Sequence, residues 1–153
     1  DFIVIDFPDP ANFALGKLYT SAFYRLLEKR LSARGLIVVQ STSPLYARQS
    51  FWCVVATLED VGFKTAPYHA LVPSFGEWGF IIAGRQEFVP VAPQGGFLRG
   101  AVDPEKPRFL TPEIVPDLFR FPADMARVPA EVNRLNNQVL VRYFEQEWRK
   151  VIR

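Results

Sequence analysis

Apolar and polar residues follow two recurring patterns along the first sixty residues of the chain. Short apolar runs, rich in β-branched residues, occupy 2–6 and 36–40, and each ends in a polar loop. Such runs are typical of buried strands in a parallel sheet. Segments at about 17–33 and 47–61 place apolar residues at helical spacing, and a glycine follows each. The order strand, helix, strand, helix predicts a parallel sheet with covering helices.

The pattern changes in the middle of the chain. Apolar stretches at 65–73 and 78–83 are separated by four residues, which predicts an antiparallel hairpin at the edge of the sheet. Residues 86–110 contain three glycines and four prolines, a composition that predicts an irregular loop. Helix-start residues at 111–113 and an amphipathic pattern over about 130–150 predict helices in the carboxyl-terminal part. We therefore expect an α/β fold with a mostly parallel sheet.

The composition excludes several classes of function. The 153 residues are 49% hydrophobic and carry a net charge of +2 without a run of Lys or Arg, so no nucleic-acid partner is expected. A single cysteine, Cys53, excludes an internal disulfide and a cysteine-based zinc site, and it suits a reducing compartment. A single histidine, His69, argues against a histidine-rich metal site. The chemistry must therefore rest on carboxylates and neutral polar groups, with no metal.

The first residues of the chain already have the pattern of a buried strand, with no capping residue or lead-in before them. We therefore expect the chain to be part of a longer protein. No apolar run reaches the ~20 residues that span a bilayer, and no signal peptide is visible. An apolar strand at the edge of an incomplete sheet favours association, so we expect a homo-oligomer.

Two loops lie where an open parallel sheet presents ligand-binding residues, beyond the carboxyl ends of its strands. They are residues 6–12 and 40–44. The first holds Asp6 and Asp9, three residues apart in a turn stiffened by proline. One carboxylate could anchor an ammonium group while the other accepts a proton from an attacking amine. The alternative, and the commoner role of an isolated Asp-x-x-Asp, is that Asp6 caps the following turn and Asp9 is a solvated loop acid.

Several motifs occur in a fixed order over the first half of the chain. They are Phe2–Pro10, Leu18–Thr20, Phe23–Tyr24, Gly35–Pro44, Val72–Gly76 and Trp78–Phe80. In their order and spacing they resemble the spermidine synthase family of polyamine aminopropyltransferases. Two later motifs, Phe121–Met125 and Asn133–Asn137, resemble the subgroup whose synthase domain follows an amino-terminal membrane region.

The resemblance implies a Rossmann-like, methyltransferase-type doubly wound sheet. Residues 1–85 would form its carboxyl-terminal half, and 86–153 a loop with a helical extension of the same domain. The implied reaction transfers an aminopropyl group from decarboxylated S-adenosylmethionine, a co-substrate, to putrescine or a similar polyamine, and yields spermidine and methylthioadenosine. No tightly bound cofactor is implied. The parent protein would lie at the cytoplasmic side of the inner membrane, and the chain alone is expected to be inactive because most of the nucleoside site would lie upstream.

The resemblance also implies roles for individual residues of the acidic segment. Asp6 corresponds to the acid that accepts the proton from the attacking amine, and Asp9 to the acid that holds the diamine. Phe7 and Pro8 line the amine site between them, where the family usually has small hydroxyl residues. Gln40 corresponds to a glutamine that borders this site.

Three aromatic residues complete the implied site. Trp78 falls where the family often has an aromatic wall. Phe75 replaces a tyrosine of the hairpin loop and so removes a hydroxyl from the amine pocket. Phe13 replaces a proline that touches the methylthioadenosine side. These differences keep both acids but bear on which amine is the acceptor.

Two other functions stay open at this point. A related S-adenosylmethionine-dependent methyltransferase would share the doubly wound sheet, since fold alone does not fix function. Paired acids around the acceptor argue against it. A non-catalytic polyamine-binding or interaction domain is favoured by Phe7, Phe13 and Phe75, which depart from the family pattern.

A structural role is expected for the other distinctive residues. His69 alternates with apolar residues on a predicted strand, and Trp52 and Cys53 lie within a predicted helix. Core packing is the default expectation, and a dimer or membrane-domain contact the alternative, for a set of aromatic residues in the carboxyl-terminal part: Phe119, Phe121, Tyr143, Phe144 and Trp148.

Overall fold

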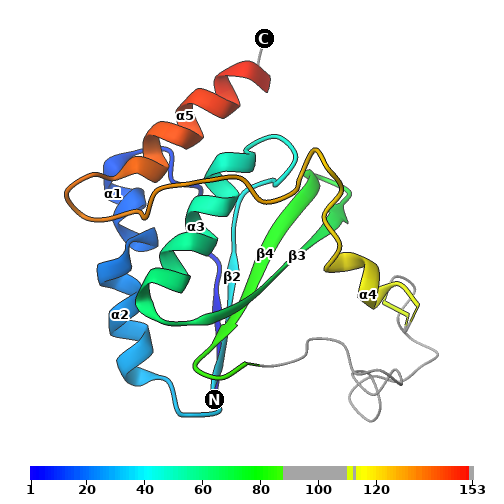
Figure 1. Ribbon diagram of the computed structural model, residues 1–153. Helices are drawn as coiled ribbons and strands as arrows, with labels where there is room; N and C mark the ends of the chain where they lie inside the picture. Colours follow the sequence, from blue (N-terminus) through cyan, green and yellow to red (C-terminus); the bar gives the residue numbers. More distant parts are fainter. Residues whose placement is uncertain (88–109, 112, 152–153) are drawn as a thin grey trace.

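A computed structural model describes residues 1–87, 110–111 and 113–151 of the chain, which form an open four-stranded sheet with accompanying helices (Figure 1). The irregular loop expected over 86–110 lies almost wholly outside the described residues. The mixed α/β composition agrees with the fold class expected from the sequence.

The four strands run partly parallel and partly antiparallel. They are β1 (Phe2–Ile5), β2 (Leu36–Gln40), β3 (Lys64–Val72) and β4 (Gly76–Gly84), in the spatial order β1-β2-β4-β3. The expected parallel pair, β1 with β2, and the expected antiparallel hairpin, β3 with β4, are both confirmed. β4 also pairs antiparallel with β2, because the hairpin folds its second strand back beside β2. The expectation of a mostly parallel sheet is therefore wrong for the described strands, where one pairing is parallel and two are antiparallel.

Helices follow β1, β2 and β4 along the described part of the chain. They are α1 (Phe13–Gly16), the 3-10 helix η1 (Lys17–Tyr19), α2 (Ser21–Arg30), α3 (Arg48–Val61), α4 (Val115–Leu118) and α5 (Val139–Val151). The helix expected over 47–61 is confirmed, and Gly62 ends it with a φ of +106° that favours glycine. The helix start expected at 111–113 is displaced, because the Ile114 N–H bonds the Thr111 carbonyl at 3.1 Å in a turn before α4. None of the helices in the described residues is both long and apolar enough to cross a membrane.

The segment expected as one helix over 17–33 is divided at Thr20. Thr20 has an extended backbone (φ −88°, ψ 156°), and its side-chain oxygen accepts a hydrogen bond from the Phe23 N–H at 3.4 Å. Thr20 therefore ends one helical turn and caps the next, as N-cap threonines do. The second helix, α2, ends at Arg30, three residues earlier than expected.

The helix expected over 130–150 begins only at Val139. The Asn137 side-chain oxygen accepts hydrogen bonds from the Arg134 N–H at 2.9 Å and the Val139 N–H at 3.3 Å, which caps α5 at this point. Gln138 has a φ of +40°, a left-handed backbone that cannot lie inside a right-handed helix. The residues before α5 instead form an irregular segment that crosses α3 (Figure 1).

The hydrophobic core lies between α3 and the sheet. Ile37 and Val39 of β2 and Ile81 of β4 are fully buried on the face that meets α3. Trp52 and Cys53 of α3 are buried in the same cluster, as expected. Figure 1 shows α1, α2, α3 and α5 on one side of the sheet, which agrees with this placement of the core.

His69 of β3 has the partners of a structural histidine. Its Nδ1 lies 2.5 Å from a carboxylate oxygen of Glu77, and its Nε2 lies 2.7 Å from the Arg120 carbonyl. The Phe121 ring packs beside the imidazole, with a centroid distance of 4.8 Å. His69 thus fastens the segment after α4 to the hairpin.

β1 is less buried than its apolar sequence predicts. Phe2 and Val4 are 62% and 67% exposed, whereas Ile5 is 4% exposed. β1 forms one edge of the described sheet, and only its α3-facing side contributes to the core. The prediction of a fully buried strand is therefore wrong for Phe2 and Val4.

Candidate active site

The carboxyl ends of β1 and β2 lie side by side. In the parallel register Ile5 is opposite Val39. Asp6 and Gln40 each follow these residues by one position, so both lie at one edge of the sheet, where neighbouring strands are about 4.8 Å apart. The structure thus places the two loops singled out from the sequence next to each other.

The segment from Asp6 to Pro10 presents two carboxylates in different environments. Asp6 is exposed and Asp9 is half-buried. Burial raises the pKa of the Asp9 carboxyl above its ordinary value. The following helix, α1, is capped by Asn12, whose side-chain oxygen accepts a hydrogen bond from the Leu15 N–H at 3.0 Å. Asn12, and not Asp6, therefore caps α1, and the Asp6 side chain is exposed.

Tyr19 holds the backbone between the two acids. Its side chain is 2% exposed, and its hydroxyl lies 3.1 Å from the carbonyl oxygens of both Phe7 and Pro8. The Phe7 ring packs edge-on against the Tyr19 ring, with centroids 6.2 Å apart. Burial, together with the nearby carboxylates of Asp9 and Asp6, raises the pKa of Tyr19 well above its ordinary value. The phenol therefore stays protonated and donates to these carbonyls at any physiological pH.

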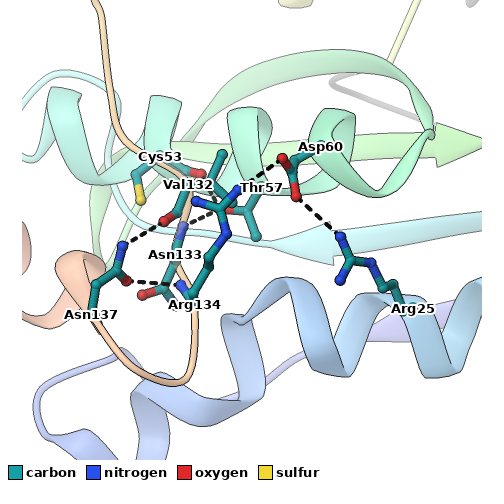
Figure 2. Close-up of polar contacts among 8 residues, drawn as sticks. All are labelled: Arg25, Cys53, Thr57, Asp60, Val132, Asn133, Arg134 and Asn137. Carbon is teal, nitrogen blue, oxygen red and sulfur yellow. Dashed lines mark hydrogen bonds and ion pairs between the residues drawn. The ribbon is translucent and has the colours of Figure 1, made fainter.

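Asn133 holds the turn that carries Tyr19. It is fully buried, and its side-chain amide donates to the Gly16 carbonyl at 3.2 Å and to the Tyr19 carbonyl at 3.1 Å. Its backbone N–H donates to the Thr57 hydroxyl of α3 at 2.9 Å. Figure 2 shows Asn133 beside Thr57, on the irregular segment that crosses α3. Three distant parts of the chain thus meet at one residue, Asn133, through its side-chain amide and its backbone N–H.

At the surface, Asp60 binds the same irregular segment that carries Asn133. Its two carboxylate oxygens bond Arg134, on the segment that crosses α3, at 3.1 Å and Arg25 of α2 at 3.5 Å. Figure 2 shows the two guanidinium groups reaching Asp60 from opposite sides. These exposed ion pairs contribute less than the buried amide contacts, since solvent screens them.

The end of β2 also connects the acidic segment to the hairpin. Gln40 is paired with Phe80 of β4. The hydrogen-bond ladder continues beyond this pair, because the Ser41 N–H donates to the Gly79 carbonyl at 2.9 Å. This register brings Trp78, which is 7% exposed, beside the loop that follows β2. Gln40 therefore has the acidic segment on one side and the hairpin strand on the other.

An aromatic cluster stands at this end of the hairpin. Phe75 is 63% exposed, and its ring centroid lies 5.4 Å from that of Trp78. Trp148 of α5 lies 6.4 Å from Trp78 between centroids, and its indole N–H donates to the Thr42 hydroxyl at 3.2 Å. Trp148 was expected to pack in the core. The structure instead places it against the loop after β2, where it extends the aromatic wall expected from Trp78.

Phe13 is placed apart from this cluster. It is the first residue of α1 and exposes 62% of its side chain. The structure thus brings Asp6 and Gln40 together at one end of the sheet, with Asp9 three residues further along the same loop. Trp78 and Phe75 contact each other on the hairpin, whereas Phe13 is exposed on the following helix. Among the described residues, no cluster of three or more His, Cys, Asp or Glu side chains could hold a metal ion.

Sequence reasoning missed the contributions of Tyr19, Asn133 and Trp148. Tyr19 and Asn133 each fall within a motif of the resemblance, but a motif does not reveal that a hydroxyl binds backbone carbonyls 11 and 12 positions earlier. Trp148 follows the apolar spacing of an amphipathic helix, which is the ordinary signal of core packing.

Comparison with known proteins places this chain in a family. Residues 1–91 match the spermine/spermidine synthase domain. The polyamine aminopropyltransferase of Leptospira interrogans is 47% identical over 152 residues, which cover 99% of this chain and 29% of the relative. Polyamine aminopropyltransferase 2 of Ralstonia nicotianae is 50% identical over 155 residues, which cover 100% of the chain and 29% of the relative.

A more distant relative gives the same assignment. Polyamine aminopropyltransferase 1 of Streptomyces coelicolor is 36% identical over 149 residues, which cover 97% of this chain and 27% of the relative. The chain therefore spans less than a third of the length of the relatives it matches. The synthase-domain match and the chain-wide identity agree with the resemblance inferred from the motifs. By this similarity, the chain belongs to the spermine/spermidine synthase family.

Proposed function

We propose that this chain carries the amine-acceptor side of a polyamine aminopropyltransferase, which transfers an aminopropyl group from decarboxylated S-adenosylmethionine to putrescine. The observation that carries the proposal is the pair of acids, Asp6 and Asp9, on a short segment whose intervening carbonyls are held by Tyr19. The names of the relatives support the reaction class. The products are spermidine and methylthioadenosine.

The chemistry is a displacement at a carbon activated by a positively charged sulfur. The amine nitrogen forms a bond to this carbon, the carbon–sulfur bond breaks, and its electron pair neutralises the sulfonium. The attacking nitrogen must be neutral and then loses one proton. Asp6, the exposed acid at the sheet edge, accepts that proton. The protein contributes alignment, one base and one anchor, and needs no metal or tightly bound cofactor for these steps.

Asp9 anchors the remote ammonium of the diamine. Its pKa is raised by burial in the absence of a ligand, so a carboxylate at this position is short of favourable partners. A bound ammonium favours the ionised form and offsets the burial. The same pairing holds the diamine in register, so that its other nitrogen lies near Asp6.

The remaining predicted residues surround the amine. Phe7 and Pro8 connect the two acids, and Gln40 borders the site from the end of β2. Trp78 and Phe75 supply an apolar wall for the methylene chain. Phe13 belongs to the side that meets methylthioadenosine.

The proposal includes a complete doubly wound sheet. The parallel pair β1–β2, joined through α2, is the kind of unit from which such sheets are built. The homo-oligomeric state, the amino-terminal membrane region of the parent protein and its location at the cytoplasmic side of the inner membrane stay predictions.

The test is ligand binding and turnover by the intact parent protein. Calorimetry with putrescine and with methylthioadenosine should show binding of both, and labelled decarboxylated S-adenosylmethionine should yield labelled spermidine. Binding of the nucleoside alone would replace the proposal with methyl transfer. Binding of polyamine alone, without turnover, would replace it with a non-catalytic polyamine-binding domain.

A further inference from the structure

Only two residues, Phe7 and Pro8, separate the two acids along the chain. The carbonyl oxygens of these two intervening residues are contacted by one hydroxyl. That hydroxyl belongs to Tyr19, at 3.1 Å from each oxygen. Proline already fixes one of the intervening backbone torsions. With both carbonyls held, few torsions between the acids are left to vary, so the hydroxyl determines how the segment presents its two carboxylates.

Tyr19 is itself held from the carboxyl-terminal part of the chain. The Asn133 amide donates to the Tyr19 carbonyl, and the Asn133 carbonyl accepts from the Ser21 N–H at 2.9 Å, on the other side of Thr20. The Asn133 side-chain oxygen accepts from the Leu140 N–H at 3.3 Å at the start of α5. The turn that carries Tyr19 is therefore bonded on both sides to residue 133.

We infer that Tyr19 is a positioning residue of the amine site, and that Asn133 connects it to the carboxyl-terminal segment. Through its hydroxyl, Tyr19 sets the direction of the Asp6 and Asp9 carboxylates without touching the amine itself. The inference rests on the proposed function for its effect on catalysis, but the contact between hydroxyl and backbone is independent of any substrate.

A purely structural role of the Tyr19 ring can be separated from this one. The ring is buried and packs against Phe7, so Tyr19→Phe keeps the packing and removes only the hydroxyl. Tyr24 offers a matched control on the next helix. Its ring is fully buried, and its hydroxyl has no hydrogen-bond partner within the described part of the chain. Tyr24→Phe thus removes a buried hydroxyl without removing a bond to the acidic segment.

Both variants would be made in the intact parent protein and compared in two measurements. The first is steady-state kinetics with putrescine as the varied substrate. Tyr19→Phe should raise the KM for putrescine roughly three- to tenfold, the value of one hydrogen bond, with a smaller change in kcat. Tyr24→Phe should leave both constants within about twofold, since no bond is lost.

The second measurement is hydrogen–deuterium exchange of the peptide that contains residues 6–12, in the absence of substrate. Tyr19→Phe should speed exchange in this peptide, including the Ala11 N–H that bonds the Asp9 carbonyl at 2.7 Å. Tyr24→Phe should not. Equal exchange and equal KM in the two variants would overturn the inference. If the wild-type protein transfers no aminopropyl group, the proposed function fails, while the exchange measurement still decides whether Tyr19 orders the segment.

Discussion

The carboxylate of Glu147 in α5 caps the first turn of α3 through Ser50. One of its oxygens accepts hydrogen bonds from the Ser50 N–H at 3.0 Å and the Ser50 hydroxyl at 2.6 Å, and the other accepts from the Gln49 N–H at 2.7 Å. α3 lacks a capping side chain of its own, because its N-cap residue is Ala47. A residue almost a hundred positions later therefore satisfies amide groups that would otherwise lack partners.

Glu147→Ala should destabilise the protein by about 1–2 kcal/mol, the usual cost of losing a helix cap. The negative charge of Glu147 also interacts favourably with the positive end of the helix dipole, so its removal adds to the loss of stability. Thermal unfolding of the intact protein measures the effect. Glu145→Ala is the matched control, since Glu145 lies on the same helix and, within the described residues, pairs with exposed Arg149 at 3.6 Å. Equal melting temperatures for the two variants would show that the cap contributes nothing.

Asp6→Asn should remove the proposed base while keeping the shape of the site. We expect kcat to fall by about 10²–10⁴-fold, the usual contribution of general-base catalysis, with a small change in putrescine affinity. Steady-state kinetics with putrescine as the varied substrate should show that the loss lies in kcat. Asp117→Asn is a suitable control, because Asp117 is an exposed acid of α4 that pairs with Arg120. A kcat unchanged by Asp6→Asn would exclude Asp6 as the base.

Asp9→Asn should weaken amine binding and yet stabilise the ligand-free protein. The pKa of Asp9 is raised in the folded state, so folding takes up a proton between the ordinary and the raised pKa, and the free energy of unfolding falls as pH rises through that range. At neutral pH the ionised carboxyl therefore opposes folding, and asparagine removes this effect. At pH 7 the variant should have a higher melting temperature than the wild type. Below pH 3.8 the two melting temperatures should be the same. A lower stability of Asp9→Asn than of the wild type at pH 7 would contradict the raised pKa of Asp9 in the folded state.

Glu59 should give the protein the opposite pH dependence. Burial acts to raise its pKa, but hydrogen bonds from Arg127 and Thr65 outweigh burial and lower it. The stabilisation is then fully present above the ordinary glutamate value of 4.5 and is lost as pH falls through the lower, folded-state value. Because the pair is partly exposed, we expect no more than about 1 kcal/mol. Glu59→Gln should remove this acid sensitivity in urea titrations between neutral and low pH, and an unchanged titration would contradict it.

The sequence predicts those elements whose signals are local. The strand at 36–40 and the helix closed by Gly62 have clear boundaries, because a β-branched run and a C-terminal glycine act within a few residues. Thr20 divides a helix that apolar spacing alone makes continuous, since a threonine is compatible with both a helix interior and a cap. α5 begins later than expected because the Asn137 side chain accepts hydrogen bonds from backbone N–H groups around it. The spacing of apolar residues does not reveal such bonds.

The candidate site likewise contains residues that local signals predict and residues whose role depends on tertiary contacts. Asp6 and Asp9 can be found from the sequence, because their position after a strand is local and their motif is specific. The role of Tyr19 depends on backbone carbonyls, which look alike at every position of a sequence. That of Trp148 depends on the hairpin register and on the place where α5 crosses the loop after β2. Such contacts are set by tertiary packing, which overrides local pattern.

The contact between Asn133 and the Tyr19 turn has a consequence for the order of folding. During synthesis the acidic segment leaves the ribosome more than a hundred residues before Asn133, and chains are made at roughly 5–20 residues per second. The strands and α3 can collapse in that interval, but the turn that carries Tyr19 gains its last partners only after residue 133 has emerged. The nascent chain should therefore acquire its fold before it acquires the final geometry of its acidic segment.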